Sequence, residues 1–188
     1  MLLKGKTICI DPGHAGPGID PGCVGPMGTD EATVAWDISN RVAAILQNRW
    51  GAAIIMTKND VVDAPSDSLS YRASVANNAG ADIFVSIHLN AGSPAAHGTE
   101  TFFYAGSDAG SKLAQSIQNQ LVACLGLTDR GLKTANYAVL RLTDMTAVLT
   151  EVCFLSNYDE EEYINRDDIR QKAAEAIAQG LVDYLVTN

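Results

Sequence analysis

Short apolar runs along the chain alternate with longer segments in which apolar residues recur every three or four positions. The short runs predict strands at Lys6–Asp11, Ala52–Thr57, Ala81–Leu89, Gly98–Tyr104, Ala138–Leu142 and Ala147–Val152. The longer segments predict helices at Asp30–Trp50, Ser70–Ala79, Asp108–Leu125 and Asp167–Val186. Alternation of strands and helices is typical of an α/β fold around a mostly parallel sheet. We therefore expect one α/β domain over residues 1–188.

One long loop interrupts this alternation directly after the first predicted strand. Between Pro12 and Gly28, ten of the seventeen residues are glycine or proline. A connection of this length without regular structure is uncommon in a compact domain unless it carries a function. Ligands of open α/β sheets collect at the carboxyl ends of strands, and this loop begins at such an end.

The charge and the apolar content exclude several classes of partner. The 188 residues include 22 acidic and 13 basic side chains, which give a net charge of −9. An acidic chain is a poor match for nucleic acid or an anionic membrane surface, and we expect neither as a partner. No apolar run approaches the ~18 residues of a membrane span. The segment Met1–Lys6 lacks the apolar region of a signal peptide, so we expect another export route or a domain excised from a longer protein.

Two of the three histidines follow predicted strands. His14 comes after the first strand, and His88 lies near the end of the most apolar one. Strand ends meet at one edge of a parallel sheet, so these imidazoles are candidates for a shared metal ion. The ordinary alternative is that each is a surface or core residue. His97 lies in a polar run of small residues, and we interpret it as a surface residue.

Two carboxylates are candidates to join the histidines. Glu31 opens the first predicted helix, where the helix dipole alone would explain an acidic residue. Glu151 interrupts the apolar segment Ala147–Phe154, where a desolvated carboxylate is costly unless it is paired or coordinated. A buried acid at a strand end is a candidate for a functional site. The competing interpretation of Glu151 is a structural ion pair with Arg130 or Arg141.

Several motifs follow one another along almost the whole chain. They are IDPGH (Ile10–His14), a glutamate that opens the first helix (Glu31), SLSYRASVANNAGADIFVSIHLNAG (Ser68–Gly92), GTETFFY (Gly98–Tyr104), DRGLK (Asp129–Lys133), YAVLR (Tyr137–Arg141) and AVLTEVCFLSN (Ala147–Asn157). In this order and spacing they resemble the zinc-dependent N-acetylmuramoyl-L-alanine amidases. The resemblance implies a single domain with a twisted, mostly parallel mixed sheet and helices on both faces.

The same resemblance implies the residues of the site. The zinc ligands of the family fall on His14, Glu31 and His88, and its catalytic glutamate falls on Glu151. Two imidazoles and one carboxylate are a common ligand set of catalytic zinc and leave one position for water. The implied reaction is hydrolysis of the amide between the lactyl group of N-acetylmuramic acid and L-alanine in peptidoglycan. Glu151 would be the general base.

Other polar residues are candidates for binding the substrate, namely Asn90, Arg130, Lys133 and Arg141. The basic side chains would offset the acidic field and hold carboxylates, although a structural role explains each equally well. Asp11 is a candidate to orient His14 through a hydrogen bond. Lys58 stands where the family often has arginine, and Cys153 where it often has glycine.

Two other functions remain open on the residues alone. One is a zinc peptidase or amidohydrolase with a different substrate, and the other is a non-catalytic wall-binding module of the same fold. The motifs do not separate an autolysin from a sporulation enzyme or a phage endolysin. We expect a monomer that acts on the cell wall, outside the cytoplasm, with peptidoglycan as its partner. Because both the chain and the wall are acidic, tight binding is expected to come from a separate targeting domain, a partner or the zinc ion itself.

Overall fold

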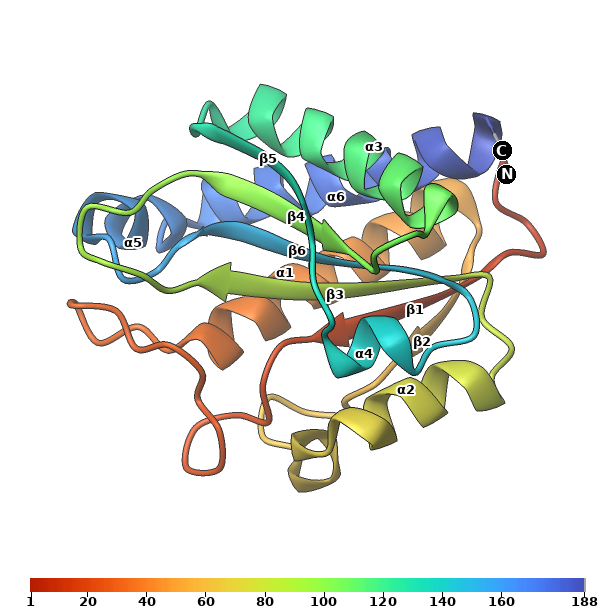
Figure 1. Ribbon diagram of the computed structural model, residues 1–188, viewed down its shortest axis with the longest axis horizontal. Helices are drawn as coiled ribbons and strands as arrows, with labels where there is room; N and C mark the ends of the chain where they lie inside the picture. The colour runs from red at the N-terminus through yellow and green to blue at the C-terminus, as the bar shows by residue number, and fades with distance from the viewer. Residues whose placement is uncertain (188) are drawn as a thin grey trace.

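A computed structural model describes residues 1–187 of the chain. At its centre lies a six-stranded sheet with the strand order β2-β1-β3-β6-β4-β5 (Figure 1). The strands are β1 (Thr7–Pro12), β2 (Ala53–Met56), β3 (Ile83–Asn90), β4 (Thr99–Phe103), β5 (Asp129–Thr134) and β6 (Thr146–Phe154). Strands β1, β2, β3 and β6 are parallel, whereas β4 is antiparallel to β6, and β5 is parallel to β4. This mixed, mostly parallel sheet confirms the predicted fold class.

Helices cover both faces of this sheet. On one face lie α1 (Glu31–Ile45), α3 (Asp108–Leu125) and α6 (Asp167–Thr187), and on the other lie α2 (Leu69–Asn78) and α4 (Ala138–Arg141) (Figure 1). The remaining helical segments are η1 (Leu46–Trp50), which continues α1, then η2 (Ala64–Asp67) and α5 (Tyr158–Ile164).

The central strand β3 is buried on both faces. Its residues Ile83, Val85 and Ile87 join the larger core with α1, α3 and α6. Phe84 points to the opposite face and joins the smaller core beneath α2 and α4. Burial on both faces explains why the sequence of this strand is a nearly continuous apolar run.

One predicted strand is wrong. The run Ala138–Leu142 does not form a strand, because Ala138–Arg141 is the short helix α4. Its residues Val139 and Leu140 are buried in the smaller core. An apolar run this short fits the helical period as well as the strand period, so the pattern did not distinguish them. The pattern also missed the edge strand β5, whose residues are half-buried or exposed.

The loop rich in glycine and proline is tied to the distant helix α5. The carboxylate of Glu161, which is fully buried, accepts hydrogen bonds from the backbone N–H groups of Met27 (2.7 Å) and Thr29 (3.0 Å). A β-carbon on Gly25 would lie 2.4 Å from the Glu161 carboxyl carbon. The loop backbone therefore approaches Glu161 more closely than a residue with a side chain at position 25 would allow. These contacts fix the segment that leads into α1 and therefore the position of Glu31.

Across residues 1–187, every helix is too short or too polar to cross a membrane.

Candidate active site

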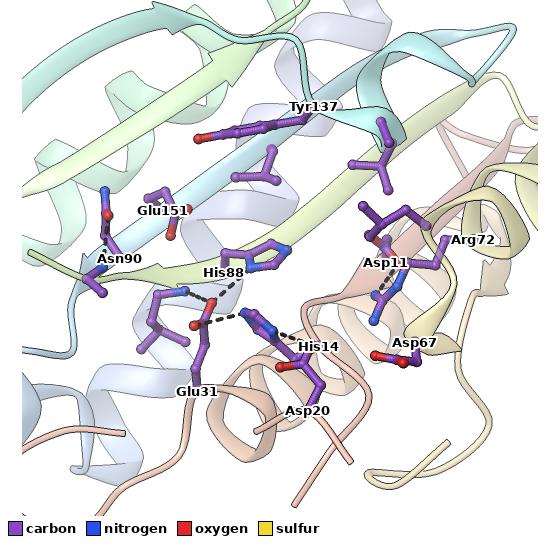
Figure 2. Close-up of a pocket in the computed structure, with 16 residues that line it drawn as sticks. Asp11, His14, Asp20, Glu31, Asp67, Arg72, His88, Asn90, Tyr137 and Glu151 are labelled. Carbon is purple, nitrogen blue, oxygen red and sulfur yellow. Dashed lines mark hydrogen bonds and ion pairs between the residues drawn. The ribbon is translucent and has the colours of Figure 1, made fainter. Parts of the chain in front are cut away.

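The carboxyl ends of the parallel strands bring the predicted site residues together. His14 follows β1, and His88 near the end of β3 pairs in register with Glu151 on β6. Glu31 is the first residue of α1, which begins where the long loop ends. Figure 2 shows these four side chains around one pocket, with the Glu31 carboxylate joined by dashed lines to both imidazoles. His97 is exposed, as predicted.

Glu31 accepts hydrogen bonds on both of its carboxylate oxygens. Its Oε2 lies 3.0 Å from His14 Nε2, and its Oε1 lies 2.8 Å from His88 Nδ1. The backbone N–H groups of Cys23 and Leu89 each donate at 3.0 Å to these same oxygens. Burial alone would raise the pKa of Glu31, but the bonds from the two histidines outweigh it and hold the pKa well below its ordinary value.

The loop closes tightly over this cluster at Gly22. Its backbone is left-handed, with a φ of 70°. A β-carbon there would lie 2.5 Å from His14 Cδ2 and 2.6 Å from Glu31 Oε2. Only glycine combines this backbone conformation with so close an approach.

His14 is oriented by Asp20 and not by Asp11, so the prediction for Asp11 is wrong. His14 Nδ1 lies 2.7 Å from Asp20 Oδ2, which leaves Nε2 directed at Glu31. A partner on one ring nitrogen fixes the orientation of the imidazole and directs the other nitrogen at a ligand. Burial lowers the pKa of His14, but Glu31 and Asp20 together raise it to about 9.

Asp11 belongs to a buried hydrogen-bond network near the end of β1. Its Oδ1 accepts from Arg72 Nη1 (2.8 Å) and Thr57 Oγ1 (2.5 Å), and its Oδ2 accepts from Ser86 Oγ (2.6 Å). Arg72 also donates to the backbone oxygen of Pro12 at 2.6 Å. The network therefore fixes the end of β1, two residues before His14.

Glu151 differs from the other carboxylates because one of its oxygens has no partner. Its Oε2 is buried and has no hydrogen bond within the described residues. Burial is the main cause that raises the pKa of Glu151 from 4.5 to about 7; His88 lowers it, and Glu31 and Glu100 raise it further. The alternative of a structural ion pair is wrong, because Arg130 binds Glu100 (2.7 Å) and Arg141 binds Asn136 (2.7 Å).

The cluster has the donors that a metal ion requires. Ligand atoms of His14, Glu31 and His88 all lie within 4.8 Å of one another, and no other such group of three occurs in residues 1–187. Two imidazoles and one carboxylate match a catalytic zinc site, which keeps one position open. The unpartnered Glu151 oxygen beside this cluster is a group of the type that such sites use as a proton acceptor. The residues therefore fit a catalytic zinc ion.

The pocket that contains the cluster has a volume of about 540 Å³. Its wall also includes the apolar residues Leu69, Ala138, Val139 and Leu149. Figure 2 shows the ring of Tyr137 across the pocket from Glu31, above Glu151. Tyr137 is not predicted to line a pocket, because the pattern assigns the residues that follow it, Ala138–Leu142, to a strand.

The candidates for substrate binding are mostly engaged elsewhere. Asn90 lines the pocket, but its Oδ1 accepts from Ala91 N (2.9 Å) and its Nδ2 donates to Glu100 (2.7 Å). Arg130 and Lys133 lie on the far side of Glu100, and Lys133 Nζ is 3.8 Å from its carboxylate. Neither they nor Arg141 are among the residues that line the pocket.

Glu100 contacts three of these candidates, Asn90, Arg130 and Lys133, and was not predicted. It is 5% exposed and pairs in register with Glu151 across β4 and β6. The only signal for it in the sequence is an acidic residue inside the predicted strand Gly98–Tyr104.

The mixed α/β sheet, the imidazole–carboxylate cluster at its strand ends and the unpaired acid beside it have the make-up of a metal-dependent hydrolase. Residues 8–183 match the N-acetylmuramoyl-L-alanine amidase family. The chain belongs to this family, as the resemblance of its motifs implied.

Relatives and solved structures agree with this assignment. An uncharacterized cell wall amidase of Bacillus anthracis is 39% identical, and the N-acetylmuramoyl-L-alanine amidase LytC of Bacillus subtilis is 37% identical. Each alignment covers 97% of this chain but 36% of the relative, so the chain spans about a third of these proteins. The catalytic domain of CwlV, an amidase from Bacillus (Paenibacillus) polymyxa, superposes with a TM-score of 0.88 at 36% identity, over 96% of this chain and 98% of that one.

Proposed function

We propose that this chain is a catalytic domain, spanning residues 1–188, that hydrolyses the amide between the lactyl group of N-acetylmuramic acid and L-alanine in peptidoglycan. Membership of the amidase family supports the choice of bond. The observation that carries the chemistry is the unpartnered Glu151 oxygen beside the cluster of His14, Glu31 and His88. A wall-binding module would have no use for a carboxylate with a buried, unpaired oxygen in that place.

His14, Glu31 and His88 are proposed to hold one zinc ion. When bound, zinc polarises a carbonyl oxygen and lowers the pKa of a water molecule to about 7. Asp20 keeps the Nε2 of His14 directed at the site through its bond to Nδ1. The three ligand residues would thus bind and orient the metal ion. Because they are engaged in this way, a different residue would transfer the proton.

Glu151 is proposed to carry the proton. Its carboxylate takes a proton from the attacking water and delivers it to the nitrogen of the departing L-alanine. Without metal the pKa of Glu151 is raised to about 7, and a bound cation would lower it, so the carboxylate would be ionised and able to accept a proton at neutral pH. Val139, Leu149 and Tyr137 line the same pocket as this carboxylate.

The place of action and the partners follow from the substrate. We propose that the chain acts as a monomer on the cell wall outside the cytoplasm. With its charge of −9, the domain gains little attraction from an anionic wall, so a separate targeting domain would provide tight binding. Relatives such as LytC, which extend well beyond the aligned region, are consistent with such a domain.

The proposal is tested by digesting purified peptidoglycan and analysing the products. We expect new L-alanine amino termini on intact stem peptides and no new reducing sugar ends. A chelator should stop the release, and added zinc should restore it. New termini at another residue would indicate a different amidohydrolase, and zinc-dependent binding without cleavage would indicate a wall-binding module.

A further inference from the structure

The backbone of His14 has a conformation that its sequence does not favour. Its φ is 61°, and within residues 1–187 no other residue besides glycine has a positive φ. A β-carbon makes this left-handed region unfavourable, so surrounding contacts must hold the residue there. The side-chain bond to Asp20 fixes the ring, but it leaves the backbone turn itself to be explained.

Lys58 is hydrogen-bonded to the backbone at that turn. Its Nζ donates to the backbone oxygen of His14 at 3.0 Å and to that of Val61 at 2.9 Å. The side chain is only 1% exposed, and no carboxylate of the described residues lies within 4.0 Å of the ammonium group. A buried cation whose acceptors are main-chain oxygens is expensive to keep. The two hydrogen bonds from Lys58 fix the backbone oxygens of His14 and Val61 in place.

The two loops joined by Lys58 also touch each other directly. Asp63 N donates to the backbone oxygen of Ala15 at 2.9 Å. A β-carbon on Gly16 would lie 2.2 Å from the backbone oxygen of Val61. The loop after β1 therefore rests on the loop after β2, and the ammonium of Lys58 lies at their junction.

We propose that Lys58 is a positioning residue for the metal site. By holding the His14 carbonyl, it keeps the left-handed turn that directs His14 Nε2 at Glu31, 3.0 Å away. Lys58 therefore sets the affinity of the cluster for zinc without being a ligand. The inference rests on the proposed function insofar as His14 is a ligand, and it adds a residue from a different loop.

The test compares Lys58→Met with Lys58→Arg, and uses the exposed Lys112→Met on α3 as the matched control. The zinc dissociation constant is measured by competition with a chelating dye, and the Tm of each protein is measured without metal. We expect Lys58→Met to weaken zinc binding about 10- to 100-fold, as loss of an outer contact of a ligand typically does. Lys58→Arg keeps a cationic donor and should stay within about threefold of the wild type.

A wild-type dissociation constant in a folded Lys58→Met protein would overturn the inference. So would equal losses in the arginine and methionine variants at unchanged Tm. If Lys58→Met does not fold, the wild type decides: its Lys58 ammonium protons should exchange slowly with solvent in ¹⁵N spectra and shift on zinc addition. Rapid exchange with no shift would also overturn it. If the wild type itself binds no zinc, the proposed function fails instead.

Discussion

Glu31 and Glu151 line the same pocket, yet their surroundings differ in every respect that sets their charge. Both oxygens of Glu31 accept hydrogen bonds, from two imidazoles and two backbone N–H groups. Glu151 has a buried oxygen with no partner in the described residues. The first carboxyl has a pKa well below its ordinary value, and the second has a pKa of about 7.

The difference shows how one residue type serves two purposes in one site. A carboxylate that stays charged at every working pH suits the binding of a cation. A carboxyl that gains and loses its proton near pH 7 suits proton transfer. The contrast arises from position: Glu31 begins a helix that faces two histidines, whereas Glu151 lies within a strand beside Glu100.

Replacing Glu31 should give the largest effect. In Glu31→Ala the two imidazoles lose their shared partner, so zinc and hydrolysis should be lost together. The metal-free protein should also lose about 3–5 kcal/mol of unfolding free energy, as for a broken buried pair. Metal analysis and chemical denaturation test this, with the exposed Glu162→Ala on α5 as the matched control. Full zinc content in Glu31→Ala would return Glu31 to a role in the helix dipole alone.

Replacing Asp20 should also weaken the metal site, but by less than replacing Glu31. Asp20→Asn weakens the bond to His14 Nδ1 while keeping its size. We expect zinc binding to weaken about 10- to 100-fold, with hydrolysis restored at high zinc. The exposed Asp159→Asn should bind zinc like the wild type. An unchanged affinity in Asp20→Asn would show that His14 needs no such partner.

The two carboxyls should separate in a pH titration of the metal-free protein. By ¹³C NMR, Glu151 should titrate near pH 7, and Glu31 should stay ionised to far lower pH. The pKa of Glu151 is raised above its unfolded value of 4.5, so its contribution to stability is lost as pH rises from there through 7. The contribution of Glu31 has the opposite sign and is lost as pH falls below its ordinary pKa. If Glu31 and Glu151 titrated over the same pH range, the proposed difference between the two carboxyls would be wrong.

The basic residues outside the pocket should give the smallest effects. Arg141 is exposed and binds Asn136 within its own segment. Arg141→Ala should change hydrolysis less than about threefold, because the side chain is exposed and does not line the pocket. A rise of tenfold or more in KM, with kcat unchanged, would restore Arg141 as a substrate-binding residue.

The sequence predicted best what depends on strands. His14, His88 and Glu151 follow or interrupt apolar runs, and a parallel sheet brings the ends of such runs together. Asp20 could not be predicted, because its contact with His14 depends on the path of a loop with several left-handed glycines. Tyr137 was missed for a related reason: four apolar residues fit a helix as well as a strand.

The central claim is that holding the metal and moving the proton belong to different residues, and Glu151→Gln tests it most directly. Zinc content and hydrolysis of peptidoglycan are measured on the same sample of this variant and of the wild type. We predict one zinc per chain in both, and release of stem peptides reduced about 10²- to 10⁴-fold in the variant. Wild-type release, or loss of zinc from the variant, would contradict the claim.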